Sequence, residues 1–596
     1  MTLAAPFLYL FLLGTGFCLY SIFLTPLVRK FAISVGCVAR PSNDRWGRRV
    51  VARLGGFSIA LGFLGAVGWT TQQEPRMVGL LFGGLLMLLT GLIDDFRGIH
   101  PYSKLIAQII AGCLVVIFGI QIDVTIPWLA LPLTIGWLVL VMNAFNLMDN
   151  MDGLAAGIGV IATGFCIWQT IQKGEWLIAI VATSLAGSTL GFLRYNFPPA
   201  KIFMGDTGSQ VLGLGLGSVA VMGTWHQSTR LLSIVALPTL LLAVPIFDTF
   251  FVTIQRILHG RHPFQGGRDH LSHRLGILGL TTRQVVLTLY GMSAVCGALG
   301  VVLTTQSSSV VIGIGLLVVG LFLIVGSYLG KIRVYVGSSA PRMEPRVTLI
   351  ETMLLHKRRI TEVLVDFILI CASYVMAHAL RFEANITPDV EALILKSLPW
   401  VVAIKLLCFF SCGLYRGVWR YISLPDLVNI FRAVTIGSVL SALVLLYLWR
   451  FEGYSRAAFI IDGLLLFVVI SGARLAEPLL NEWVSACVRG ATPVLIIGAG
   501  DTGELLLQQL KLSPQRKRRV IGFLDDDVTK QGDCIHGVQI IGSRQELGRV
   551  VHAFGVREVL IAMQQPPTDL VQQIKGYCEE NGLEWRVVQT MAPIDR

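Results

Sequence analysis

Charged residues are scarce in this 596-residue chain, and their scarcity excludes an ordinary soluble fold. Asp, Glu, Lys and Arg make up 14% of the sequence, whereas they make up about 25% of a typical soluble domain. Hydrophobic residues reach 54%, and the mean hydropathy is +0.70. This composition predicts a polytopic α-helical membrane protein in contact with a lipid bilayer.

Paired cysteine motifs are also lacking. The eleven cysteines include no CxxC pair and no Cys/His spacing typical of zinc. Cys408 and Cys412 are four residues apart in an apolar run, a spacing that in a membrane span is more typical of packing than of ligation. No zinc site is therefore predicted.

Apolar runs long enough to cross a membrane, about 17 to 25 residues each, begin at about fifteen positions. Eleven begin before residue 335, near Phe7, Leu54, Val78, Leu105, Pro127, Leu154, Trp176, Gln210, Leu231, Val285 and Val310. Four more begin near Ile360, Lys396, Ala433 and Ala458. The first run lacks a basic segment and an evident cleavage site, so we expect a span rather than a signal peptide.

The net charge of +12 arises from basic residues that lie in alternate loops. The loops after the first and ninth runs are rich in arginine. In the loops at 71–76, 121–127, 172–175 and 305–309, the only basic residues are Arg76 and Lys173. The positive-inside rule makes the two arginine-rich loops cytoplasmic. Membrane topology thus explains the charge, and no nucleic-acid partner is predicted.

Four aspartate-bearing segments lie at the ends of apolar runs. They contain Asp94 and Asp95, Asp149 and Asp152, Asp206, and Asp248. In this topology all four face the cytoplasm. Carboxylates beside the hydrocarbon region are costly to keep, and Mg²⁺ prefers oxygen ligands. The pattern predicts a site for Mg²⁺ and phosphates at one membrane face.

Three motifs resemble the polyprenyl-phosphate N-acetylhexosamine-1-phosphate transferases, of the glycosyltransferase family 4 type. They are GLIDDFR at 91–97, followed by Lys104, then NAFNLMDNMDGL at 143–154 and FMGDTGS at 203–209. The resemblance spans residues 1–335 and implies an eleven-helix enzyme of the bacterial inner membrane. Such an enzyme transfers a sugar-1-phosphate, here GlcNAc-1-phosphate by preference, from a UDP-N-acetylhexosamine to undecaprenyl phosphate. It releases UMP and initiates a surface polysaccharide such as peptidoglycan or the O-antigen of lipopolysaccharide.

The resemblance also implies roles for residues on the cytoplasmic side. Asp94 and Asp95 would activate the lipid phosphate, Lys104 would contact a phosphate, and Asp206 would bind Mg²⁺ or Mn²⁺. The nucleotide would be read by Asn146, Asp149 and Asp152. The alternatives are an interfacial lysine and residues that only cap a helix end.

The segment from 262 to 275 resembles the family's histidine-rich sugar-recognition loop. His270, His273 and Arg274 keep the frame of that loop, and Ser272 stands where a second histidine is common. The substitution leaves the sugar specificity open. A basic cytoplasmic loop without a role in recognition is the alternative.

A second module follows a shift in composition. We predict a basic cytoplasmic linker at 336–359, a four-helix transmembrane module at 360–476 and a cytoplasmic Rossmann-like nucleotide-binding domain at 477–596. Gly498, Gly500 and Gly503 form a GxGxxG motif, and Asp525 follows 22 residues after Gly503. With the segments at 413–421 and 522–527, they resemble the N-terminal half of membrane-bound nucleotide-sugar 4,6-dehydratases and epimerases.

That second resemblance implies NAD or a nucleotide-sugar as the ligand. The Tyr-xxx-Lys pair of dehydrogenases is absent, because Tyr577 is followed four places later by Asn581. We therefore predict binding rather than sugar oxidation, and a domain that only packs or forms a homo-oligomer is the alternative. Asp366 and Asp462, in the later runs, are assigned no role.

Two other functions fit the composition of the whole chain. A lipid-linked sugar transporter would also have many spans with intramembrane acids, and a catalytically inactive scaffold would keep the fold. The carboxylates gather at one predicted membrane face instead of lining a pathway at mid-depth. The sequence therefore favours the transferase.

Overall fold

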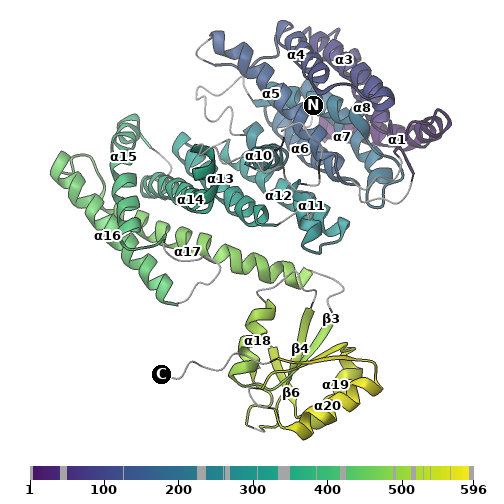
Figure 1. Ribbon diagram of the computed structural model, residues 1–596. Coiled ribbons are helices and arrows are strands. Elements are labelled where there is room, and N and C mark those ends of the chain that lie inside the picture. Colours follow the sequence, from purple (N-terminus) through teal and green to yellow (C-terminus); the bar gives the residue numbers. More distant parts are fainter. Residues whose placement is uncertain are drawn as a thin grey trace. The chain divides into compact units, whose positions relative to one another are not determined.

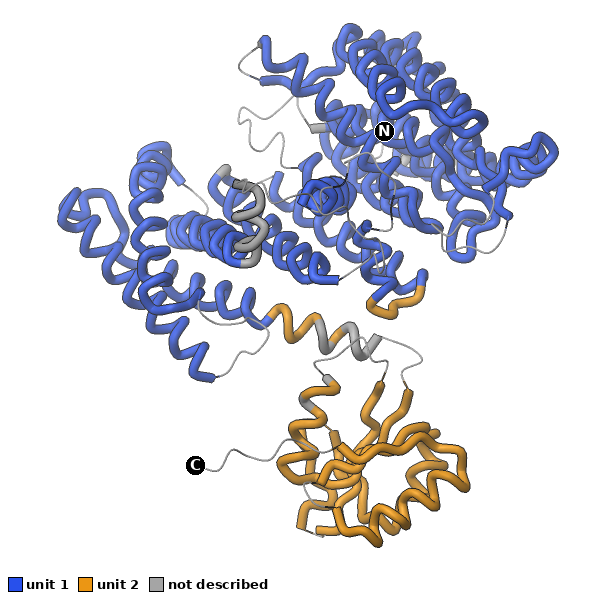
Figure 2. The backbone as a smooth tube through the Cα atoms, viewed as in Figure 1, with its two compact units in different colours: residues 1–277, 282–475 blue, residues 278–281, 476–596 orange. Residues whose placement is uncertain are grey.

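The computed structural model describes residues 4–39, 50–124, 127–224, 237–258, 261, 267, 269–304, 306–332, 349–383, 386–415, 424–487, 492–511, 518–527, 529–536, 538–563 and 566–588. The chain divides into two compact units (Figure 2). Unit 1 contains residues 1–277 and 282–475, and unit 2 contains residues 278–281 and 476–596. The start of the run predicted near Leu231 and much of the predicted 336–359 linker lie outside the described residues.

The first part of unit 1 is a bundle of helices (Figure 1). Its helices are α1 (Ala4–Ser34), α2 (Gly56–Thr70), α3 (Arg76–Arg97), α4 (Pro101–Ile117), α5 (Pro127–Met148), α6 (Leu154–Gln172), α7 (Trp176–Asn196), α8 (Gly205–Thr224), α10 (Ala243–Leu258), α11 (Leu271–Ile277), α12 (Thr282–Leu303) and α13 (Ser308–Gly330). Two short antiparallel strands, β1 (Val38–Ala39) and β2 (Val51–Ala52), follow α1. Long apolar runs form helices because a helix satisfies its own backbone hydrogen bonds in lipid.

The second part of unit 1 consists of α14 (Leu349–Arg381), α15 (Pro388–Ser411), α16 (Leu424–Trp449) and most of α17 (Arg456–Cys487), whose residues from 476 onward belong to unit 2. Helix α14 packs against α13, so the four helices join the first bundle through one core. The acids that the sequence left without a role form buried ion pairs here. Asp366 lies 2.6 Å from Arg474, and Asp462 pairs with Lys405.

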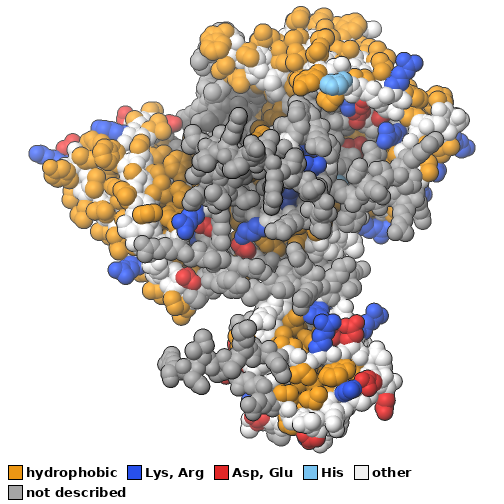
Figure 3. Space-filling model, in the orientation of Figure 1, with side chains coloured by type: hydrophobic (Ala, Val, Ile, Leu, Met, Phe, Trp, Pro, Cys, Tyr) orange, Lys and Arg blue, Asp and Glu red, His pale blue; other side chains and the backbone are white. Residues whose placement is uncertain are grey.

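Within the described residues, eleven helices are long and apolar enough to cross a membrane: α1, α3, α5, α6, α7, and α12 to α17. Helices α2 and α4 are shorter apolar helices. The side chains of Leu89, Ile106 and Leu443 are exposed. Hydrophobic side chains cover much of the visible surface of unit 1 (Figure 3). These features are those of a multi-pass membrane protein. Every predicted run coincides with a helix in the described residues, and the run near Leu231 does so from residue 237 onward.

Helix α8 lies at the centre of the first bundle, because it packs against α2, α3, α5, α6 and α7. Its close approach to α3 depends on Gly91. A Cβ atom at Gly91 would lie 2.5 Å from the Cα atom of Thr207, in the first turn of α8. The glycine therefore brings the N-terminus of α8 against the C-terminal half of α3, where the paired aspartates lie.

Unit 2 contains a six-stranded sheet with the order β5-β6-β4-β3-β7-β8. Its elements are β3 (Thr492–Ile497), α18 (Asp501–Lys511), β4 (Arg518–Leu524), β5 (Cys534–Ile535), β6 (Val538–Gly542), the short 3₁₀ helix η1 (Arg544–Glu546), α19 (Leu547–Phe554), β7 (Glu558–Ile561), α20 (Thr568–Glu580) and β8 (Glu584–Val587). All neighbouring strands pair in parallel except β5 and β6.

Helices cover both faces of this sheet, so the parallel strands are apolar on both sides. Leu495 and Ile497 of β3 belong to the core that includes α19 and α20. Val494 and Ile496, at the alternate positions, pack with α18. The strand order reverses direction between β3 and β7, which places the loop after β3 at a switch in the topology.

Candidate active site

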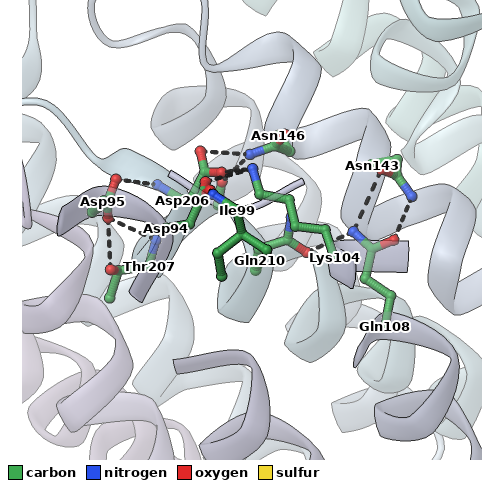
Figure 4. Close-up of polar contacts among 11 residues, drawn as sticks. Asp94, Asp95, Ile99, Lys104, Gln108, Asn143, Asn146, Asp206, Thr207 and Gln210 are labelled. Atoms are coloured by element: carbon green, nitrogen blue, oxygen red, sulfur yellow. Dashed lines mark hydrogen bonds and ion pairs between the residues drawn. The ribbon is translucent and has the colours of Figure 1, made fainter. Parts of the chain in front are cut away.

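Lys104, near the start of α4, lies between two carboxylates. Its Nζ atom is 2.6 Å from Asp94 Oδ2, near the end of α3, and it also pairs with Asp206 Oδ2 in the first turn of α8 (Figure 4). Asn146 Nδ2, near the end of α5, donates to Asp206 Oδ1 at 2.9 Å. We call Asp94, Lys104, Asn146 and Asp206 the acidic cluster. Four predicted site residues from four helices thus meet at one place.

The two adjacent aspartates have different surroundings. Asp94 accepts a hydrogen bond from the backbone N–H of Ile99 at 2.5 Å and faces Lys104. Asp95 instead accepts from the N–H groups of Asp206 and Thr207, both at 3.0 Å, and from the Thr207 hydroxyl at 2.7 Å. The carboxylate of Asp95 therefore satisfies the first backbone donors of α8, which a helix leaves unpaired at its N-terminus.

Gly205 lets Asp95 approach so closely. Its φ angle is +73°, a conformation that favours glycine. A Cβ atom at this position would lie 2.6 Å from Asp95 Oδ2. Gly205 and Asp95 together fix the direction in which α8 begins, and Asp206 follows directly.

The residues after α5 extend the site toward α11. Asn150 Oδ1 accepts a hydrogen bond from the Ser272 hydroxyl at 2.6 Å. Asp152 accepts from the N–H of Ala200 at 2.8 Å. Burial raises the pKa of Asp152 above its usual value, although the Ala200 N–H partly opposes this shift. Asp149 lies directly after α5, and its predicted contact with a nucleotide stays a prediction.

The predicted histidine segment is held by buried carboxylates. His270 Nδ1 lies 2.8 Å from Asp248 Oδ2, and the Leu271 N–H donates to Asp248 Oδ1 at 2.8 Å. Asp269 forms two bonds with the Arg256 guanidinium, at 2.7 and 2.9 Å. Burial of Asp269 opposes its ionisation, but the Arg256 guanidinium outweighs this effect and holds the pKa of Asp269 below its usual value. The segment is thus anchored to α10, and residues 262–266 and 268 lie outside the described residues.

Arg274 is only 4% exposed and bonds to backbone carbonyls. Its guanidinium donates to Asp269 O at 2.9 Å, Leu329 O at 2.8 Å and Ile332 O at 2.9 Å. His273 is 5% exposed. The predicted sugar contacts of His270, His273 and Arg274 stay predictions, and Arg274 would have to exchange these bonds to reach a sugar.

In unit 2, the three glycines of the GxGxxG motif have different surroundings. Gly498 has a φ angle of +104°, and a Cβ atom at Gly503 would lie 2.1 Å from Gly498 O. A Cβ atom at Gly500 would meet nothing within 4 Å. Asp525 Oδ2 accepts from the Ala499 N–H at 2.7 Å, so this carboxylate ties the end of β4 to the glycine loop. Gly498 and Gly503 are thus required by the loop itself, whereas Gly500 leaves open space.

Comparison with known proteins agrees with the geometry of unit 1. The model of glycosyl transferase family 4 matches residues 77–224, which include all of the acidic cluster. A probable undecaprenyl-phosphate N-acetylglucosaminyl 1-phosphate transferase of Bacillus subtilis is 37% identical over 278 residues, covering 45% of this chain and 77% of the relative. The chain belongs to glycosyl transferase family 4.

Other relatives of this glycosyl transferase carry similar names. A decaprenyl-phosphate N-acetylglucosaminephosphotransferase of Mycolicibacterium smegmatis is 32% identical over 355 residues, covering 52% of this chain and 87% of the relative. An undecaprenyl-phosphate alpha-N-acetylglucosaminyl 1-phosphate transferase of Yersinia pestis is 27% identical over 320 residues, covering 51% of this chain and 84% of the relative. A model described as a CoA-binding domain matches residues 411–588, which is consistent with a fused second module.

The acidic cluster contains Asp206, the residue predicted to bind a metal ion. Within the described ranges, no group of three or more His, Cys, Asp or Glu side chains is arranged to hold a metal. Asp94 and Asp206 nevertheless offer two carboxylates beside one ammonium group. One or two carboxylates suffice for Mg²⁺ when substrate phosphates and water supply its other ligands. The residues present therefore fit the predicted ion.

Sequence reasoning missed several polar residues of this glycosyl transferase. The pair of Arg256 and Asp269 was not predicted, and neither were Gln108, Asn143 and Gln210, which bond to one another beside the acidic cluster (Figure 4). Each of these three amides follows or precedes a cluster residue by three or four positions in an apolar run. That spacing, which places both residues on one helix face, was the available signal.

Proposed function

We propose that this glycosyl transferase moves an N-acetylhexosamine-1-phosphate, preferably GlcNAc-1-phosphate, from its UDP form to undecaprenyl phosphate. An oxygen atom of the lipid phosphate attacks the β-phosphorus of the UDP-sugar and forms a new pyrophosphate bond. The bond from that phosphorus to the bridging oxygen breaks, and the bridging oxygen leaves with UMP. The product is a lipid-linked sugar that initiates a cell-surface polysaccharide.

The observation that carries this proposal is the position of Lys104 between Asp94 and Asp206. Two anions must meet in the reaction, so the largest contribution to the rate comes from fixed positive charge. Lys104 supplies such a charge, and Asn146 orients Asp206 by donating to its Oδ1 atom. The relatives named as polyprenyl-phosphate transferases support the choice of acceptor.

We propose that Asp206 binds Mg²⁺, with Mn²⁺ as the alternative ion, and that Asp94 contributes to the same site. The ion, when bound, supplies charge that polarises the pyrophosphate. A phosphate monoester has a second pKa of about 6, so the acceptor is already largely ionised at neutral pH. The role of Asp94 is therefore to position the acceptor and the charges around it more than to remove a proton.

The proposal extends to the membrane and to unit 2. The cytoplasmic face of a bacterial inner membrane would carry the site, because the arginine-rich loops predict that orientation. We propose that unit 2 is a cytoplasmic Rossmann-like domain, on the basis of its strand order and glycine loop. Its proposed ligand is NAD or a nucleotide-sugar, and titration of the full-length protein with NAD, UDP-GlcNAc and coenzyme A tests this choice.

The decisive experiment measures UMP release and lipid-linked sugar with Mg²⁺, undecaprenyl phosphate and either UDP-GlcNAc or UDP-GalNAc. The full-length protein is compared with Asp206→Asn and with Asp123→Asn, a matched change in an exposed loop outside the site. We expect turnover that is lost in Asp206→Asn and kept in Asp123→Asn. Absence of turnover with both donors in folded protein would favour the transporter or the inactive scaffold.

A further inference from the structure

Helices α4, α5 and α8 each carry two polar residues about one turn apart. One residue of each pair belongs to the acidic cluster, and the other lies about one turn away on the same helix, in a second group (Figure 4). The pairs are Lys104 and Gln108, Asn146 and Asn143, and Asp206 and Gln210. We call Gln108, Asn143 and Gln210 the amide layer. Residues three or four apart share one helix face, with a rise of about 4.5 to 6 Å between them.

Gln108 is the centre of the amide layer. Its Oε1 atom accepts from Asn143 Nδ2 at 2.8 Å, and its Nε2 atom donates to Gln210 Oε1 at 2.9 Å and to Asn143 Oδ1 at 3.4 Å. Gln108 is 1% exposed and Gln210 is 3% exposed. One side chain of α4 is therefore bonded to both α5 and α8.

The amide layer constrains how the three helices can rotate. A buried amide without a hydrogen-bond partner is costly in apolar surroundings. If α4 rotated by one residue, or about 100°, Gln108 would lose its partners and face apolar atoms. The same rotation would carry Lys104 away from Asp94 and Asp206. The bonds that satisfy Gln108 are thus made in the same orientation that assembles the acidic cluster.

We propose that Gln108 is a positioning residue for the transfer reaction. Through Asn143 and Gln210 it fixes the rotation of the three helices that present Lys104, Asn146 and Asp206. This inference rests on the proposed function, because the reaction defines what must be positioned. Gln108 itself touches no reacting group.

The kinetic test compares Gln108→Leu with a matched control. Trp137→Phe also removes a hydrogen bond between α5 and α8, from Trp137 Nε1 to Gly217 O at 3.2 Å, but outside the amide layer. We expect Gln108→Leu to lower kcat by about 10- to 100-fold, because small displacements of reacting groups are costly. The KM values for UDP-sugar and lipid phosphate should change by less than about threefold. Trp137→Phe should retain kcat, and Gln210→Met, which leaves Gln108 bonded to Asn143, should lose less than Gln108→Leu.

A second readout needs no turnover. An ammonium group held by two carboxylates reacts slowly with acylating reagents, so the labelling of Lys104 in the full-length protein can be followed by mass spectrometry. We expect labelling to be at least about fivefold faster in Gln108→Leu and unchanged in Trp137→Phe, since loss of one ion pair exposes the amine. Both variants are first checked for equal thermal unfolding profiles, which separates positioning from loss of fold.

The outcomes separate the two proposals. A fall in kcat with faster Lys104 labelling in Gln108→Leu, and neither change in Trp137→Phe, supports the positioning role. Unchanged kcat and labelling in Gln108→Leu, or equal changes in Trp137→Phe, would overturn it. If the unchanged protein transfers no sugar but Gln108→Leu still releases Lys104, the proposed function fails while the control of the cluster by Gln108 stands.

Discussion

Replacing Asp95 by Ala should destabilise the start of α8, and any effect on the reaction should follow from that loss. The carboxylate of Asp95 accepts three hydrogen bonds, two of them from the backbone N–H groups of Asp206 and Thr207. Leaving a buried donor unsatisfied costs about 1 to 3 kcal/mol. Thr207 is fully buried, so water cannot replace the lost carboxylate there, whereas the Asp206 side chain is 24% exposed. We therefore expect Asp95→Ala to lose about 2 to 4 kcal/mol of local stability.

Hydrogen exchange measures this loss directly. Because each 1.4 kcal/mol corresponds to about a factor of ten, amides in the first turn of α8 should exchange about 30- to 1,000-fold faster in Asp95→Ala. The peptide covering residues 203–212 can be followed by mass spectrometry on full-length protein in lipid nanodiscs. Asp206→Asn is the control, because it keeps both backbone donors and should leave the exchange rate nearly unchanged.

Turnover completes the comparison. Asp95→Ala should lower kcat because Asp206 then loses its fixed direction. Asp95→Asn, which keeps one acceptor oxygen, should lose less protection and less activity. If Asp95→Ala abolished turnover while exchange in α8 remained as slow as in the unchanged protein, the capping role would be refuted and a direct chemical role would follow.

Four further results are expected. Lys104→Met should lower kcat by about 100- to 1,000-fold, as measured by UMP release, because the phosphates lose a fixed charge. Chelation with EDTA should abolish turnover, and Mg²⁺ should restore it; full activity in EDTA would contradict the proposed ion. Arg274→Ala should lower the thermal unfolding temperature because it breaks bonds to backbone carbonyls, whereas a tenfold rise in the KM for UDP-sugar at unchanged stability would indicate a sugar contact instead. In unit 2, Gly503→Ala should disrupt folding because its Cβ would contact Gly498, whereas Gly500→Ala should fold normally and weaken only ligand binding, as circular dichroism and titration would reveal.

The helices of this protein could be predicted from sequence because the signal is an average over many residues. An apolar run of about 20 residues tolerates a few polar exceptions, so the run that begins near Leu105 and contains Gln108 was still recognised. The meeting of Asp94 with Asp206 was also expected, since the motifs that contain them resemble motifs of one family. Unit 2 was predicted as a Rossmann-like domain from its GxGxxG motif and from the resemblance of its motifs to those of another family. Its glycine loop follows β3 as expected.

The different roles of the paired aspartates were not predicted. Adjacent residues on a helix point about 100° apart, so Asp94 and Asp95 make different contacts: Asp94 faces Lys104, and Asp95 faces the backbone N–H groups at the start of α8. Which of them would face Lys104 depends on the packing of α3 against α8, and the partners of Asp95 lie more than one hundred positions away. A single sequence carries no record of such backbone contacts. Likewise, the sequence does not distinguish an arginine that faces solvent from one that, like Arg274, bonds to buried backbone carbonyls.

The cap on α8 also determines where the phosphates of a substrate can find positive charge. A helix N-terminus with free N–H groups is an anion site, but in α8 the first donors are already bonded to the Asp95 carboxylate. We therefore expect the neutralising charge to come from Lys104 and from the proposed metal ion. If the two act on the same phosphates, the turnover of Lys104→Met should depend more steeply on Mg²⁺ concentration than that of the unchanged protein. A higher Mg²⁺ concentration should then be needed for half-maximal turnover. An identical Mg²⁺ dependence in both proteins would mean that lysine and metal act on separate groups.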